Sequence, residues 1–312
     1  MDRKTKITVA GIGGVGGYLS AMLARRYEHV TLVARGERKK ALEEQGIHMN
    51  SEFHGEITAK PWKIVEKAQE IQEKQDLVFI CVKTYSLEEI CKDLQDCIDE
   101  HTVILPVMNG ADTAERARKF LGRGHVLDAV IYITAFSNPD YSVTQIGRYA
   151  KIQIGKKEPS QEEKQALEEA WTCMKEAGMD VHISQDVEAA VWEKYIFNCG
   201  YNVLTTYYME MVEDLQASPE KCREFRQLME EAYAVSQAKK IQVRDGYIES
   251  EYQRFLRLDA GSTSSLKRDR EAGKRDELET FSGYLVSEAK KLGVPVPLTE
   301  RMYEKLRRQP GL

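Results

Sequence analysis

Three polar side chains spaced four residues apart, Lys194, Asn198 and Asn202, form a distinctive chemical pattern in the second half of the chain. Residues four apart on a helix are neighbours on one face, so these side chains would form a single stripe. An ammonium and two amides among apolar neighbours are costly in a core unless they line a polar cleft, and asparagine is a poor helix former. We therefore favour a functional stripe over the alternative, a helix face turned to solvent.

A glycine-rich segment, Gly11-Ile12-Gly13-Gly14-Val15-Gly16, lies between a strand-like run at residues 7–10 and a helix-compatible run at residues 18–26. Glycines permit a tight turn and a close approach of the backbone to a ligand, while N–H groups at a helix start bind negative charge. The segment therefore predicts a site for the pyrophosphate of a dinucleotide. A glycine-rich turn with a purely structural role is the alternative.

The end of the next strand-like run favours NADP(H) over NAD(H). NAD-selective sites usually place a carboxylate about 20 residues after the glycine-rich segment, where it accepts a hydrogen bond from the ribose 2′-hydroxyl. This chain has Arg35 there, and a guanidinium can pair with a 2′-phosphate through two parallel hydrogen bonds. Arg38 or Lys39 would add positive charge, whereas Lys40 is interpreted as part of the solvated face of the following helix.

A nicotinamide enzyme that reduces a carbonyl needs a proton donor beside the developing alkoxide. Many dehydrogenases use histidine, but all six histidines of this chain lie in its first 182 residues. A donor from the second half therefore cannot be histidine, and Lys194 is the candidate. Partial burial would lower the pKa of its ammonium from about 10.4 toward neutrality, which would help it to release a proton.

The pattern of apolar runs predicts an α/β chain of two domains. Short apolar runs alternate with amphipathic segments up to about residue 185, and their near-continuous apolarity predicts strands buried on both faces. We expect a Rossmann-type, mostly parallel sheet domain over residues 1–185, with residues 143–146 and 151–154 as an antiparallel extension at the far side of the sheet. Helical spacing over residues 186–312 predicts an all-α domain, packed directly against the first with a ligand cleft between them.

The composition of the 312 residues excludes several functional classes. A dispersed net charge of −5 argues against nucleic-acid binding, and no apolar run approaches the ~18 residues that a membrane span needs. Six cysteines without metal-ligand spacing, and an N-terminus without a secretory signal, predict a cytoplasmic protein with free thiols and no metal site. A helical second domain often supplies a dimer surface, so the sequence leaves a homodimer open.

Taken in order, these motifs resemble those of the ketopantoate reductase (2-dehydropantoate 2-reductase) family across nearly the whole chain. Further matches to the family pattern are Val82-Lys83-Thr84, Asn109-Gly110, Ser264-Ser265 and Glu277. The resemblance implies NADPH-dependent reduction of a small 2-keto acid, 2-dehydropantoate, to pantoate by hydride transfer. That reaction belongs to pantothenate biosynthesis, on the route to coenzyme A.

The resemblance also implies a role for each matching residue. Lys194 would donate the proton to the ketone oxygen. Substrate contacts would come from Asn109, Asn198, Asn202, Ser265 and Glu277. Cofactor contacts would come from Gly11, Ile12, Gly13, Gly14, Val15, Gly16, Arg35, Lys83, Asn109, Ala135 and Glu277.

Four of these residues have ordinary structural alternatives. Lys83 and Asn109 could be plain loop residues, although both follow buried strands, at the sheet edge where open α/β proteins bind ligands. Ser264-Ser265 could merely cap a helix that begins near Leu266. Glu277 lies in a strongly charged segment, where a solvated position is the default.

Two departures from the family pattern leave the substrate open. Val203 stands where the family usually has proline, and Val212 begins a segment where family members often carry another substrate-contacting asparagine. A reductase of another small 2-keto acid, or a β-hydroxyacid-type dehydrogenase, is therefore the alternative. A non-catalytic NADP(H)-sensing protein is a third reading, against which the presence of Lys194 argues.

Overall fold

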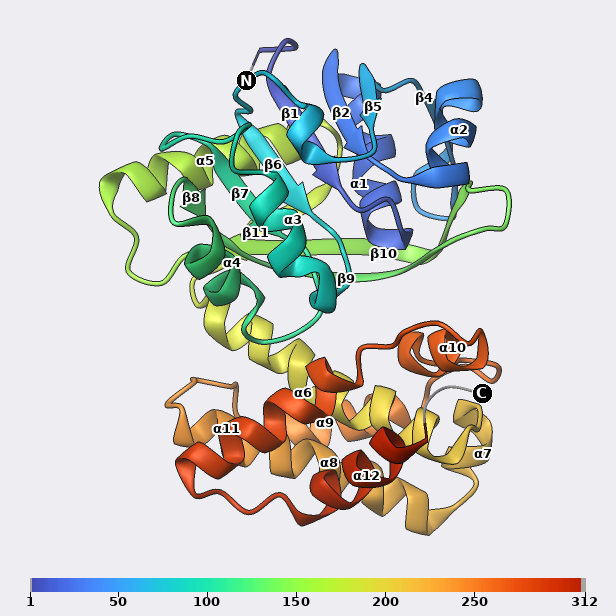
Figure 1. Ribbon diagram of the computed structural model, residues 1–312. Coiled ribbons are helices and arrows are strands. Elements are labelled where there is room, and N and C mark those ends of the chain that lie inside the picture. The colour runs from blue at the N-terminus through green and yellow to red at the C-terminus, as the bar shows by residue number, and fades with distance from the viewer. Residues whose placement is uncertain (1, 310–312) are drawn as a thin grey trace. The chain divides into compact units, whose positions relative to one another are not determined.

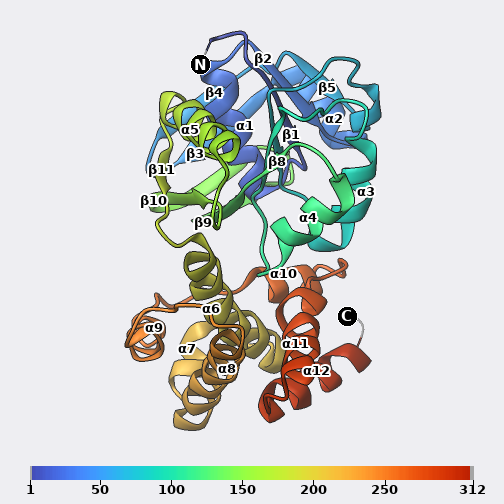
Figure 2. The same ribbon diagram turned by 90° about the vertical axis from the view of Figure 1, so that its left-hand side faces the viewer.

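The computed structural model describes residues 2–309, and the chain divides into two compact units, Met1–Val187 and Glu188–Leu312 (Figure 1). The first unit carries all the strands of the described chain, and the second is built from helices (Figure 2). This is the α/β class with a Rossmann-type first half and a helical second half that the sequence predicts.

The first sheet of the N-terminal unit is parallel throughout, with the order β5-β2-β1-β6-β7-β8. Its strands are β1 (Lys6–Ala10), β2 (His29–Val33), β5 (Lys63–Val65), β6 (Leu77–Ile80), β7 (Val103–Pro106) and β8 (His125–Val126). Successive side chains of a strand point to opposite faces, so Leu77 and Phe79 of β6 enter one apolar core while Val78 and Ile80 enter another. Both faces are covered, which explains the uninterrupted apolar runs.

The helices of this unit connect and cover the strands. They are α1 (Gly14–Arg26), α2 (Gly36–Gln45), α3 (Leu87–Asp93), α4 (Thr113–Leu121) and α5 (Gln161–Glu176), with the short 3₁₀ turns η1 (Ala68–Glu70) and η2 (Thr84–Ser86). At the start of α5, Ser160 accepts from the N–H of Glu163, whose side chain accepts in return from the N–H of Ser160. This capping box fixes the first turn of the helix.

A second sheet corrects one detail of the expected topology. Its strands are β3 (Ile47–Ser51), β4 (Gly55–Ala59), β9 (Asp128–Ser137), β10 (Val143–Gly155) and β11 (Asp180–Ile183), in the order β11-β10-β3-β4 with β9 paired to β10. Residues 143–146 and 151–154 are both parts of β10, and their antiparallel partner is β9, but neither extends the first sheet. Alternating apolar residues identify a half-buried strand without identifying the sheet that receives it, so the sequence could not make this distinction.

The C-terminal unit has no strand among its described residues. Its helices are α6 (Val187–Tyr208, which starts one residue before the unit boundary), α7 (Val212–Gln216), α8 (Pro219–Ala238), α9 (Tyr247–Phe255), α10 (Ser265–Glu271), α11 (Tyr284–Leu292) and α12 (Pro297–Arg308), with a π-helical turn, η3 (Glu279–Gly283). The buried carboxylate of Glu231 on α8 accepts from the N–H groups of Leu298 and Thr299 and from the Thr299 hydroxyl. A carboxylate at a helix N-terminus satisfies unpaired N–H groups, so Glu231 holds α12 against α8.

Across residues 2–309, no helix combines the length and the apolarity needed to cross a membrane. All six cysteines are free thiols, and all except Cys81 are buried.

Glycines on α1 let this helix approach the second sheet closely. A Cβ atom on Gly14 would lie 2.2 Å from the carbonyl oxygen of Ala135 on β9, and one on Gly17 would lie 2.4 Å from a methyl group of Val143. A Cβ on Gly16 would lie 1.9 Å from the carbonyl oxygen of Gly11. Since backbone atoms cannot move aside as a flexible side chain can, Gly14 and Gly16 have room only for hydrogen.

We expect Gly14→Ala to destabilise the protein by about 1–3 kcal/mol, because the added methyl group forces α1 away from β9. Urea unfolding of the cofactor-free protein measures the effect. Gly13→Ala is the matched control: among the described residues no heavy atom lies within 4 Å of a Cβ on Gly13, so this change should cost under about 1 kcal/mol. Equal losses in the two variants would contradict the assignment of the close contact to Gly14.

Candidate active site

The glycine-rich turn joins β1, in the middle of the first sheet, to α1. Gly11 has a φ of +94°, in the region that favours glycine, and its N–H donates to the carbonyl oxygen of Val33 at the end of β2 (3.3 Å). The start of α1 has no side-chain cap within the described chain, and its first turn holds no acidic residue. Together with the open space beside Gly13, this leaves backbone N–H groups and the positive end of the helix dipole available to an anion, which fits the pyrophosphate of a dinucleotide.

Three other predicted cofactor residues follow β2, β6 and β7 of the same sheet. Arg35 precedes α2 just beyond the end of β2, Lys83 precedes η2 beyond β6, and Asn109 follows β7. The strands β2, β1, β6 and β7 are consecutive in the parallel sheet, so their carboxyl ends gather these residues and the glycine-rich turn at one edge. After β1, the chain adds β2 and then β5 on one side of this strand. It then adds β6, β7 and β8 in turn on the opposite side of β1. Ligands of open α/β sheets bind at such a switch point.

Ala135 lies on β9 behind the glycine-rich turn, with its carbonyl oxygen against Gly14. It supports the turn from the side of the second sheet.

Arg35 is held by two carboxylates of α3. Its Nη2 donates to Oε1 of Glu89 at 2.8 Å and lies 3.9 Å from Oδ2 of Asp93. Sequence reasoning missed both acids, because a charged helix face gives no sign of a partner 54 residues away.

Arg38 lies against the glycine-rich turn rather than on a solvated helix face. Its guanidinium donates to the carbonyl oxygen of Ile12 and to Oγ of Ser137 (3.1 Å), and it sits 5.1 Å from the ring centre of Tyr141. Burial lowers the pKa of Arg38. Lys40, by contrast, is exposed and pairs with Glu37, as expected of a solvated face.

In the helical unit, hydrogen bonds link three of the predicted substrate residues. Asn198 and Asn202 lie one turn apart on α6, and Nδ2 of Asn202 donates to Oδ1 of Asn198 at 3.4 Å. Oδ1 of Asn202 accepts from the hydroxyl of Ser265 and from the N–H of Leu266, both at 3.3 Å. The first turn of α10 is thereby attached to the polar stripe of α6.

The adjacent residues Ser264 and Ser265 make different contacts. Ser264 caps α10, because its Oγ accepts from the N–H of Lys267 at 3.2 Å and from the Thr205 hydroxyl at 2.7 Å. Ser265 instead contacts Asn202. The structural alternative therefore holds for Ser264 but does not account for Ser265.

Lys194 and Glu277 interact electrostatically. Burial lowers the pKa of the Lys194 ammonium to about 8, and the negative charge of Glu277 acts in the opposite direction by favouring the ammonium. Glu277 is only 4% exposed, so it does not lie on a solvated face.

The segment after Glu277 is fixed to α6. The Tyr195 hydroxyl, next to Lys194, donates to the carbonyl oxygens of Thr280 (3.0 Å) and Phe281 (3.2 Å) on η3. The N–H of Thr280 donates back to the carbonyl oxygen of Glu277 at 2.9 Å. These bonds keep Glu277 beside the helix that carries Lys194.

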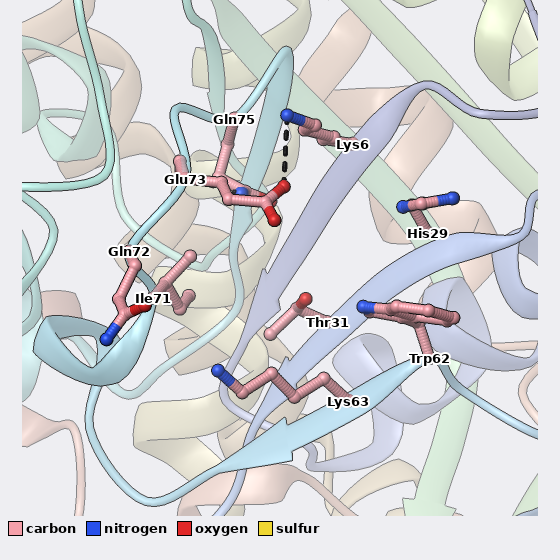
Figure 3. A pocket seen from close by; sticks show the side chains of 9 residues that line it. All are labelled: Lys6, His29, Thr31, Trp62, Lys63, Ile71, Gln72, Glu73 and Gln75. Carbon is pink, nitrogen blue, oxygen red and sulfur yellow. Dashed lines mark hydrogen bonds and ion pairs between the residues drawn. The ribbon is translucent and has the colours of Figure 1, made fainter.

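A pocket of the first unit lies where strands of the first sheet begin (Figure 3). Its lining includes Lys6, His29 and Lys63, the first residues of β1, β2 and β5, so it opens at the amino ends of the strands, opposite the glycine-rich turn. Lys6 pairs there with Glu73 at 3.0 Å, and Trp62 stacks on His29. None of the predicted site residues lines this pocket.

Comparisons with known proteins agree with the fold and with the family that the sequence resembles. The family model described as ketopantoate reductase PanE/ApbA matches residues 7–159, and the model of its C-terminal part matches residues 186–309. A curated relative from Aquifex aeolicus, named 2-dehydropantoate 2-reductase, is 25% identical over 301 residues, covering 95% of this chain and 94% of the relative.

Two solved structures show the same fold. A PanE/ApbA family ketopantoate reductase from Ralstonia eutropha is 26% identical with a TM-score of 0.87, covering 97% of this chain and 98% of that one. A D-mandelate dehydrogenase, solved with NADH and anilino(oxo)acetate, is 20% identical with a TM-score of 0.84 and the same coverage. The second likeness shows the fold alone.

The pKa of Lys194 should fall below about 8 in Glu277→Gln, because the change removes the negative charge that favours the ammonium. A ¹³C NMR titration of the lysine ε-carbons measures this pKa, and the resonance lost in Lys194→Arg identifies the signal. Glu279→Gln is the control: its carboxylate accepts from the Tyr303 hydroxyl at 2.8 Å and does not act on Lys194. A pKa that stays the same or rises in Glu277→Gln would refute the coupling.

Proposed function

The chain belongs to the ketopantoate reductase PanE/ApbA family, and we propose that it uses NADPH to reduce 2-dehydropantoate to pantoate. The observation that carries the proposal is Lys194, a lysine whose pKa is lowered to about 8 and which shares α6 with Asn198 and Asn202. A proton donor with a pKa near the working pH suits the reduction of a ketone. In the cell the product would enter pantothenate biosynthesis.

The cofactor part of the proposal rests on the glycine-rich turn and Arg35. Backbone N–H groups at the start of α1 would bind the pyrophosphate, and the Arg35 guanidinium would pair with the 2′-phosphate. Lys83 and Asn109, from the same sheet edge, would contact the nicotinamide half. When bound, NADPH supplies the hydride that is added to the carbonyl carbon.

The chain's own groups would then complete the reduction. The Lys194 ammonium, predominantly protonated at pH 7 with a pKa of about 8, donates a proton from Nζ to the ketone oxygen. The charge of Glu277 favours the protonated form before the reaction. Asn198, Asn202 and Ser265, already connected by hydrogen bonds, would orient the substrate carboxylate and hydroxyl.

A second candidate is a reductase of a different small 2-keto acid with the same lysine chemistry. Val212, at the position where the family often has an asparagine, is fully buried and offers no polar side-chain group to a substrate. The D-mandelate dehydrogenase shows that this fold serves another substrate as well, so the fold alone does not select ketopantoate.

Oxidation of NADPH at 340 nm with 2-dehydropantoate, beside a panel of other 2-keto acids and repeated with NADH, tests the proposal. We expect the highest kcat/KM for 2-dehydropantoate with NADPH. Faster turnover of another keto acid would favour the second candidate. Tight NADPH binding without turnover of any substrate would contradict both and favour a sensor.

Lys194→Ala should lower kcat by about 10²-fold or more while leaving NADPH affinity nearly unchanged. In the unmutated protein kcat/KM should fall about tenfold per pH unit above pH 8, as the ammonium loses its proton, and Lys194→Ala should lose this dependence. Lys194→Arg, which keeps the positive charge but is a poor acid, separates proton donation from charge and should remain slow. A wild-type rate in Lys194→Ala would remove this residue from the mechanism.

A further inference from the structure

The ion pair of Arg35 crosses the sheet edge beside the glycine-rich turn. Arg35 follows β2, whereas Glu89 and Asp93 lie on α3, which follows β6. β2 and β6 are the two neighbours of β1 in the parallel sheet. The pair therefore connects the segments on either side of β1, at the edge where the turn to α1 begins.

The carboxylates and a 2′-phosphate compete for the same group. Carboxylate and phosphate oxygens both accept from a guanidinium in the same fork geometry, and Nη2 of Arg35 already donates to Glu89 at 2.8 Å. A phosphate that binds Arg35 must displace this carboxylate or stand beside its negative charge. NADH has a 2′-hydroxyl in place of the phosphate and meets no such repulsion.

Glu89 and Asp93 differ in how easily their side chains can move away from Arg35. The side chain of Glu89 is 58% exposed, so it can rotate into water, whereas that of Asp93 is only 13% exposed. Glu89 is also closer to the guanidinium, at 2.8 Å against 3.9 Å. Its removal is therefore the change that alters the charge at Arg35 with the least disturbance of the packing.

We propose that Glu89 is a specificity-determining residue of the cofactor site, whose carboxylate occupies Arg35 and so weakens the preference for NADPH over NADH. The inference rests on the proposed function, because it takes Arg35 to bind the 2′-phosphate. Glu89 acts through Arg35 and is a positioning residue. The chain thus carries both the cation that selects NADPH and an anion that limits this selection.

Binding titrations that follow the fluorescence of NADPH and of NADH, at fixed ionic strength and without substrate, test the proposal. In Glu89→Gln the Kd for NADPH should fall by about three- to tenfold while the Kd for NADH changes less than about twofold, because only the phosphate competes with the carboxylate. The ratio of the two constants is a readout that a purely structural role for Glu89 would not move.

Glu88→Gln is the matched control. Glu88 is the preceding residue of the same helix, is also exposed, and pairs with Lys92 at 2.7 Å, so this variant makes the same change of net charge away from Arg35. Its Kd ratio should match that of the unmutated protein. Repeating Glu89→Gln in an Arg35→Met background should abolish the gain, since Glu89 then has no guanidinium to occupy.

The outcomes separate this inference from the proposed cofactor. An unchanged ratio in Glu89→Gln, an equal gain in Glu88→Gln, or a gain that persists in Arg35→Met would overturn the role of Glu89 while leaving NADPH use intact. If the unmutated protein binds both cofactors equally and Arg35→Met changes neither constant, Arg35 does not bind the phosphate. In that case the proposed cofactor and this inference both fail.

Discussion

On the packed side of the turn between β1 and α1, Gly14 and Gly16 have room only for hydrogen, and the packing of α1 depends on this restriction. On one side, Gly16 lies against the carbonyl oxygen of Gly11, and Gly14 lies against that of Ala135. On the other side, the space beside Gly13 is open among the described residues. The turn connects α1 directly to β1, which lies between β2 and β6 in the first sheet. The helix dipole therefore acts at the same edge as Arg35, Lys83 and Asn109.

Much of the first unit could be predicted from its sequence because local patterns determine it. Continuous apolar runs identified the buried strands β1, β2, β6 and β7, and the glycine spacing identified the turn at the end of β1. The second sheet was harder, since β10 pairs in parallel with β3, about a hundred residues earlier, and with β11. The hairpin of β3 and β4 alternates buried and exposed residues, but it was not identified as part of a separate sheet.

The residues of the candidate site likewise fall into those that a local sequence pattern predicts and those that it does not. Residues four apart on α6 were placed on one face by helix geometry alone, and hydrogen bonding between Asn198 and Asn202 agrees with this. No pattern in the neighbouring sequence pointed to Glu277, which was selected as a site residue only through the resemblance to a family. The acids on Arg35 and the contact of Arg38 with Ile12 had no signal at all, because both depend on tertiary structure. The pairing of charged side chains across a sheet edge is decided by strand order, which a residue pattern does not contain.

The contact between Gly14 and Ala135 also means that the glycine-rich turn cannot reach its final packing until β9 has been synthesised. A chain emerges from the ribosome N-terminus first, so the glycine-rich turn is made before β9. Its support from β9 is encoded some 120 residues later, and β9 itself pairs with β10, which ends at Gly155. The nascent chain can therefore form the β1 hydrogen bonds with β2 long before the turn reaches its final packing. The end of the first unit that carries the glycine-rich turn is thus begun early and completed only when β9 and β10 have been made.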